Sequence, residues 1–171
     1  MRKIIYLFIV LFTLSCDDGN LDIASFEFEE EMNVCGDEIF TLYRLSNNGH
    51  KEVLMLTLTD KEIKNDEEEV SPLLVSESGL YTVTDRVFEE EVTSDYFCAV
   101  VPPVEPKVLK NWKGISGQIL VENKPVYDEN DATKIIAWEH IVSLQDVVLK
   151  SGDESLIFND TYFFGTFETA I

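Results

Sequence analysis

The chain has 171 residues, of which 45% are hydrophobic, and it carries 13 basic and 33 acidic residues, a net charge of −20 at neutral pH. This length and hydrophobic content suit one domain with its own core, or two small ones. The excess of acids argues against binding nucleic acid or lying flat on anionic lipid, because like charges repel.

The first fifteen residues have the pattern of a secretory signal peptide. Arg2 and Lys3 form a positive start, and residues 4–14 form an apolar run that leads to the small residue Ser15. The run is shorter than the ~20 residues that a membrane-spanning helix needs. Removal of residues 1–15 leaves 11 basic and 33 acidic residues, so the mature net charge is −22.

Cys16 follows this signal, and Thr13-Leu14-Ser15-Cys16 resembles the lipobox of bacterial lipoproteins. A lipobox usually has Leu at the third position before the cysteine and a small residue at the second, where this chain has Thr13 and Leu14. The resemblance implies cleavage before Cys16 and acylation of its sulfur. Acyl chains, at ~0.8 kcal/mol per buried CH₂, would anchor the protein to a membrane. The alternative is an ordinary secretory signal with an incidental cysteine.

Two acidic residues, Asp17 and Asp18, come directly after Cys16. Acids at this place resemble the surface-export signal of Bacteroidota lipoproteins. This resemblance implies an outer-membrane lipoprotein that faces the cell exterior. In the alternative interpretation residues 16–24 are only a flexible acidic tether, and the protein faces the periplasm.

Cys35 and Cys98 are the two remaining cysteines. Disulfides form in the oxidising compartments that a secretory signal implies, so we expect the two to pair. A bridge that closes so long a loop contributes about 4 kcal/mol in the chain-entropy model. The alternative is a pair of buried thiols, each acting as a small hydrophobic residue.

Strand patterns dominate the chain, and helix patterns are nearly absent. Asn48-Gly49 predicts a hairpin turn between the strands expected at 39–45 and 52–59. Residues 134–149 are rich in β-branched side chains, which favours a strand over a helix, and Trp138, His140 and Val142 would share one face of it. Further strands are expected at 25–29, 80–84, 87–92, 96–101, 114–122, 156–158 and 161–167.

About ten short strands with turns between them predict an all-β fold, a two-layer β-sandwich-like domain over residues 25–171. Pro102, Pro103 and Pro106 interrupt the pattern, since proline is excluded from central strands. The region 102–110 is therefore a candidate internal boundary, either a linker or a crossing between sheets.

Two local motifs invite comparison with known modules. Tyr96 precedes Cys98 by two residues, which resembles the F strand of immunoglobulin domains, but both tryptophans follow Cys98, so a generic sandwich is favoured.

The acidic turn with Asp128, Asn130 and Asp131 offers oxygen ligands for Ca²⁺. An EF-hand loop also needs a ligand at position 5 and Gly at position 6, where this turn has Ala and Thr. A plain acidic turn is therefore preferred to a calcium site, and no cofactor is expected.

No catalytic motif is found. The only histidines, His50 and His140, are far apart in sequence, and His140 lies between apolar neighbours, which favours a hydrogen-bonded histidine within a sheet. No nucleophile elbow, zinc motif, phosphate loop or dinucleotide fingerprint occurs. We expect a protein without enzymatic activity, with a polymer hydrolase that uses an unrecognised carboxylate site as the alternative. Five aromatic side chains could line a glycan platform, but in an all-β chain such residues are more often core: Trp112, Trp138, Tyr162, Phe163 and Phe164.

Three segments, SCDDG at 15–19, FEFEEEMNVCGDEIFTLYRL at 26–45 and YFFGTF at 162–167, resemble small acidic lipoproteins of Bacteroidota, of the flavobacterial type. The resemblance implies no particular activity. The sequence thus predicts a membrane-anchored surface lipoprotein with a binding or structural role in the bacterial envelope. A glycan or a protein is the expected ligand, and nucleic acid is not.

Overall fold

A computed structural model describes residues 27–67, 70, 72–99, 101 and 103–171. The expected signal peptide at 1–15, the expected tether at 16–24 and the start of the strand expected at 25–29 lie outside these residues. Within the described part, Phe28 forms an isolated bridge with Ser46 and belongs to no named strand. No helix in the described part of the chain is long and apolar enough to cross a membrane.

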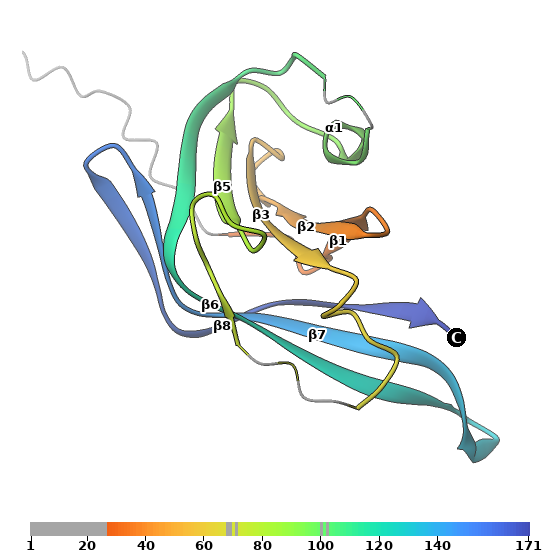
Figure 1. Ribbon diagram of the computed structural model, residues 1–171. Coiled ribbons are helices and arrows are strands. Elements are labelled where there is room, and N and C mark those ends of the chain that lie inside the picture. The colour runs from red at the N-terminus through yellow and green to blue at the C-terminus, as the bar shows by residue number, and fades with distance from the viewer. Residues whose placement is uncertain (1–26, 68–69, 71, 100, 102) are drawn as a thin grey trace, which may run out of the picture.

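The described chain is almost entirely β, which confirms the predicted all-β class (Figure 1). All strand pairs are antiparallel, in the order β1-β2-β3-β5-β6-β7-β8, and β4 also pairs with β6. The elements are β1 (Asn33–Cys35), β2 (Ile39–Leu45), β3 (Glu52–Thr59), β4 (Leu73–Leu74), β5 (Val83–Phe88), α1 (Ser94–Cys98), β6 (Val108–Asp128), β7 (Asp131–Ser151) and β8 (Glu154–Ala170).

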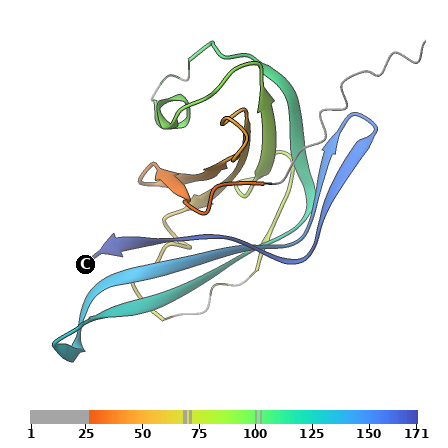
Figure 2. The same ribbon diagram turned by 180° about the vertical axis from the view of Figure 1, so that it is seen from behind.

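The sheet curls so that its first half packs on the long strands of its second half, a sandwich-like arrangement (Figures 1 and 2). Leu54 and Leu56 of β3 belong to the same buried cluster as Val142 and Leu144 of β7. β-Bulges bend strands, and the β6–β7 pairing shifts register around Gly117. Gly117 has φ +107°, and a Cβ atom there would lie 2.5 Å from the Cα of Val147, so only glycine fits this bend.

A second, smaller core lies on the other face of the first half, beneath α1. Tyr43, Val53 and Phe88 are fully buried there, and the ring of Phe97 lies 4.7 Å from that of Tyr43. The predicted strand at 96–101 is therefore wrong, because Ser94–Cys98 is helical. A six-residue apolar run does not distinguish a strand from a helical turn, and this turn directs Tyr96 and Phe97 onto the second core.

Several other predicted elements can be compared with the structure. The hairpin at Asn48-Gly49 is confirmed, since β2 and β3 pair across it. The strand expected at 134–149 is confirmed as part of β7. The expected number of about ten short strands is wrong. The strands expected at 156–158 and 161–167 are parts of the single strand β8, and one strand, β5, replaces those expected at 80–84 and 87–92. The proline-containing segment joins α1 to β6, and β6 pairs with β5 in the same sheet.

Candidate functional site

The predicted anchor and export residues, Cys16, Asp17 and Asp18, lie outside the described residues. The other two cysteines are described, and the structure joins Cys35 of β1 to Cys98 of α1 in a disulfide, with 5.4 Å between their Cα atoms. The bridge ties α1 to the edge of the sheet. Its place beside the second core indicates a structural role.

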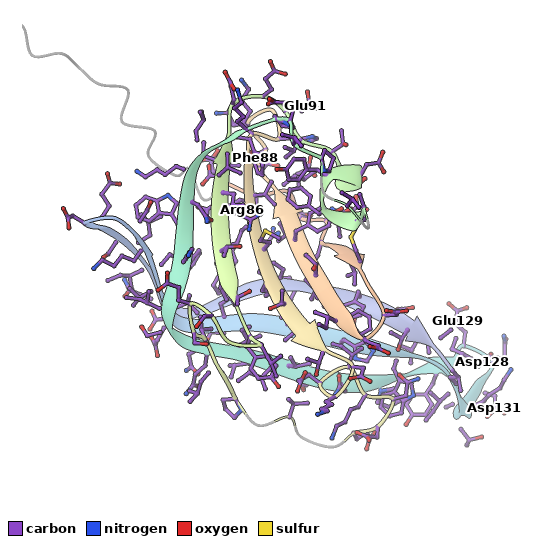
Figure 3. All side chains as sticks on the ribbon, turned by 45° about the horizontal axis from the view of Figure 1, so that its top comes forward. Arg86, Phe88, Glu91, Asp128, Glu129 and Asp131 are labelled. Atoms are coloured by element: carbon purple, nitrogen blue, oxygen red, sulfur yellow. A yellow bond between two sulfur atoms is a disulfide. The ribbon has the colours of Figure 1, made fainter. Side chains whose placement is uncertain are left out.

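The candidate calcium ligands lie in the turn between β6 and β7, and Figure 3 shows Asp128, Glu129 and Asp131 at the tip of this hairpin, remote from Phe88. Their oxygens bind the turn itself. Asp128 Oδ1 accepts the backbone N–H of Asn130 at 2.9 Å, and Asp131 Oδ1 accepts that of Thr133 at 3.0 Å. The hydrogen bond from Asn130 lowers the pKa of Asp128. The Thr133 hydroxyl, which donates to Asp131 Oδ1 at 2.7 Å, and then the Thr133 backbone N–H lower the pKa of Asp131. Within the described ranges, no group of three or more His, Cys, Asp or Glu side chains is arranged to hold a metal ion.

His140 is a fully buried, hydrogen-bonded sheet histidine, as predicted. Its Nδ1 lies 2.7 Å from Oδ1 of Asn123, and its Nε2 lies 2.8 Å from Oγ1 of Thr169. Burial lowers the pKa of the imidazole. Because both ring nitrogens are engaged inside the fold, His140 stabilises the packing of β6, β7 and β8 and does not face a substrate.

A cluster of charged side chains lies inside the fold, and the sequence analysis missed it. Arg44, Glu52 and Asp85 are all buried. Arg44 and Asp85 occupy one row of the sheet, since each is the cross-strand partner of Leu54. The next residue in that row is Trp112. The cluster therefore lies on the concave face of the sheet, between the layers.

Asp85 is the least satisfied group of this cluster. Neither of its carboxyl oxygens has a hydrogen-bond partner among the described residues, and the same is true of Nε1 of Trp112. Burial, and then the neighbouring Glu52 carboxyl, raise the pKa of Asp85 from 3.8 to about 9. Asp85 is thus protonated at neutral pH. Because Asp85 is 0% exposed, a polymeric substrate does not reach this pair of carboxyls.

A groove of about 620 Å³ lies along the long strands, between β6 and the segment that precedes β4. Its volume falls within the range of small-ligand sites. Val70 and Pro72 line one side, and the strands contribute Leu120, Ile141, Ser143 and Thr161, among others. The lining mixes apolar side chains and hydroxyl groups with the charged Glu67, Glu122 and Lys124.

The aromatic residues considered as a glycan platform divide into two groups. Trp112, Trp138 and Phe164 are buried, which confirms them as core residues. Phe163 is 54% exposed, because residues of β8 alternate between the two faces of the sheet. Tyr162 lies inside, where its hydroxyl accepts a hydrogen bond from Arg44.

Comparison with known protein families, with curated proteins and with solved structures gives no match. The function proposed below therefore rests on the residues and geometry of this chain.

Proposed function

We propose that the protein is a membrane-anchored lipoprotein of the bacterial envelope, displayed at the cell surface, with a binding or structural role. The observation that carries the proposal is Cys16, which ends a short apolar segment and precedes the first described residue, Glu27, by eleven positions. A fully extended chain spans at most ~3.5 Å per residue, so residues 17–26 would allow the domain to lie at most ~35 Å from a lipid on Cys16.

The domain itself supports a binding role over a catalytic one. The groove beside β6 is open to solvent, whereas Glu52 and Asp85, whose carboxyls lie beside each other, are buried. The strong negative charge keeps a displayed domain soluble through self-repulsion. These features suit a protein that holds a ligand outside the membrane without transforming it.

Replacement of Cys16 by Ala tests the anchor. The variant should move from the membrane fraction to the soluble fraction, whereas retention of Cys16→Ala in membranes would contradict lipid anchoring. Protease treatment of intact cells tests the facing, with the C-terminal half detected by blotting. Loss of the signal supports surface display, and protection until the cells are opened would place the domain in the periplasm.

A polymer hydrolase is the second candidate, and one observation favours it: Glu52 and Asp85 are close enough for the Glu52 carboxyl to raise the pKa of Asp85. The pair would need the layers to open before a substrate could reach it. Release of reducing ends from polysaccharide by the wild-type chain, and its loss in Asp85→Asn, would support this candidate. No release from any polysaccharide tested would remove it.

A further inference from the structure

We propose that the convex face of β6, β7 and β8 binds a neutral polysaccharide, with Phe163 as the surface on which a sugar ring stacks. This inference rests on the proposed binding function and names its ligand class. The side chains of the three long strands that point away from the core form one surface, here called the outer face.

The outer face consists of four rows of cross-strand partners, each with one residue from each long strand, and the bend at Gly117 separates the first row from the other three. The rows are Ser116–Val148–Ile157, Gln118–Gln145–Thr161, Leu120–Ser143–Phe163 and Glu122–Ile141–Thr166. Neighbouring strands lie ~4.8 Å apart and residues on one face are spaced by twice the ~3.4 Å rise, so the three rows beyond the bend cover ~10 Å across the strands and ~14 Å along them. The outer face is therefore large enough for a short run of linked sugar rings.

The outer face is nearly uncharged in a strongly acidic protein. Charged residues make up 27% of the chain, so twelve positions would be expected to hold about three, and solvent-facing sheet surfaces are usually polar. Among these twelve positions only Glu122 is charged, and two exposed acids, Asp146 and Asp160, lie at the β-bulge between the first two rows. The rows on either side of the outer face are charged. The row before it contains Lys113 and Lys150, and the row after it contains Lys124, Glu139 and Glu168.

The side chains of the outer face match the chemistry of a neutral sugar polymer. Hydroxyl and amide groups both donate and accept hydrogen bonds, and sugar hydroxyls need both. An exposed aromatic ring such as Phe163 offers a flat apolar surface to the C–H face of a sugar. Anionic ligands instead call for Arg or Lys, and the outer face has neither. Acidic side chains on and beside the outer face repel an anionic polymer, and no basic side chain among the twelve positions attracts one, so a neutral chain is favoured.

The groove beside β6 continues this surface. Five residues belong both to the outer face and to the lining of the groove: Leu120, Glu122, Ile141, Ser143 and Thr161. The rest of the lining includes the charged Glu67 and Lys124. Val70 and Pro72 add an apolar wall on the side of β4. A polysaccharide that runs across the three strands along the row Leu120–Ser143–Phe163 would stack on Phe163 of β8 and enter the groove beside β6.

Affinity electrophoresis of the full-length, detergent-solubilised protein tests the proposal. Native gels contain one polysaccharide each: a soluble β-glucan, xylan or galactomannan as neutral probes, and alginate as an anionic one. We expect at least one neutral probe to slow the protein. Phe163→Ala should weaken that binding at least fivefold, and Thr161→Ala should weaken it by a smaller factor.

Ile39→Ala is the matched control, because Ile39 is a similarly exposed apolar residue, at 58%, on a strand outside the outer face. It should bind like the wild type, and all variants should show the wild-type circular dichroism. Three results would each overturn the proposal. Every neutral probe could leave migration unchanged, alginate alone could slow the protein, or a neutral probe could slow the wild type and Phe163→Ala equally. These outcomes do not depend on the Cys16→Ala and protease experiments, so failure of polysaccharide binding and failure of surface anchoring are distinguishable.

Discussion

Arg44 of β2 donates a hydrogen bond from Nη1 to the backbone oxygen of Phe164 in β8, at 3.3 Å. These two strands are far apart in the order of the sheet, so the contact joins its two ends. The same guanidinium donates from Nε to the oxygen of Glu29 at 2.7 Å and from Nη2 to that of Phe28 at 3.5 Å. One buried side chain thus holds the curled sheet closed and fixes Phe28 and Glu29 at the start of the described chain.

Replacement of Arg44 by Met should destabilise the domain by about 2–4 kcal/mol, because buried carbonyl oxygens lose their donors. Arg44→Lys should cost less, since it keeps a donor and the charge. The measurement is urea unfolding, combined with hydrogen exchange of the amides at 163–165. These amides should lose protection before those of β3.

Arg86 provides the matched control, as the only other arginine in the described part of the chain. It is half-buried, on β5. Arg86→Met should change stability by less than Arg44→Met. Equal losses for the two variants would show that Arg44 has no special role in closing the sheet.

Asp85 gives the domain a specific dependence on pH. Its pKa is about 9 in the folded protein, against an ordinary 3.8, so between these values the folded state holds a proton that the unfolded state has lost. Its contribution to stability is complete below about pH 4 and is lost as the pH rises towards 9, by about 1.4 kcal/mol per pH unit. Asp85→Asn should remove this part of the slope.

The free energy of unfolding of the wild type, Asp85→Asn and Asp60→Asn, measured in urea from pH 5 to pH 8, checks this sign. Asp60 is exposed, so Asp60→Asn should follow the wild type. The advantage of Asp85→Asn over the wild type should grow with pH. Parallel curves for Asp85→Asn and the wild type would mean that Asp85 is ionised in the folded state.

Much of the fold follows from period-two patterns in the sequence. In β7, Trp138, His140, Val142 and Leu144 alternate with more exposed residues and are all buried, so the pattern alone predicts the strand and its inward face. Strand length was harder to predict. Asn159-Asp160 has the composition of a turn, but it lies inside β8. Asp160 adopts φ +62° there, so an irregularity within one strand takes the place of a loop.

The buried charged cluster of Arg44, Glu52 and Asp85 could not be predicted from the sequence pattern either. Polar residues at alternate positions normally mark the solvent side of a strand. In β2 both faces are covered, Leu42 and Arg44 by the long strands and Tyr43 by α1. The alternation of polar and apolar residues along β2 therefore does not indicate which face is exposed to solvent. The burial of Arg44 and Asp85 follows from the curling of the sheet, which depends on residues distant in sequence.

The disulfide holds α1 over the second core, and its removal should loosen this part of the molecule first. Cys35 and Cys98 are 63 residues apart, so the chain-entropy model gives about 4 kcal/mol for the closed loop. The double variant Cys35→Ala/Cys98→Ala should lose up to this amount in urea unfolding. Hydrogen exchange should rise at Ser94–Cys98 and in the segment that carries Phe88, while β7 keeps its protection.

Reduction of the wild-type protein is the internal comparison, because it opens the same bridge without changing the sequence. Reduced wild type and the double variant should unfold at similar urea concentrations, both below the oxidised protein. Non-reducing mass spectrometry should find the Cys35 and Cys98 peptides linked before reduction. Free thiols at both positions, together with unchanged unfolding on reduction, would show that the packing of Tyr96 and Phe97 on the second core suffices to hold α1.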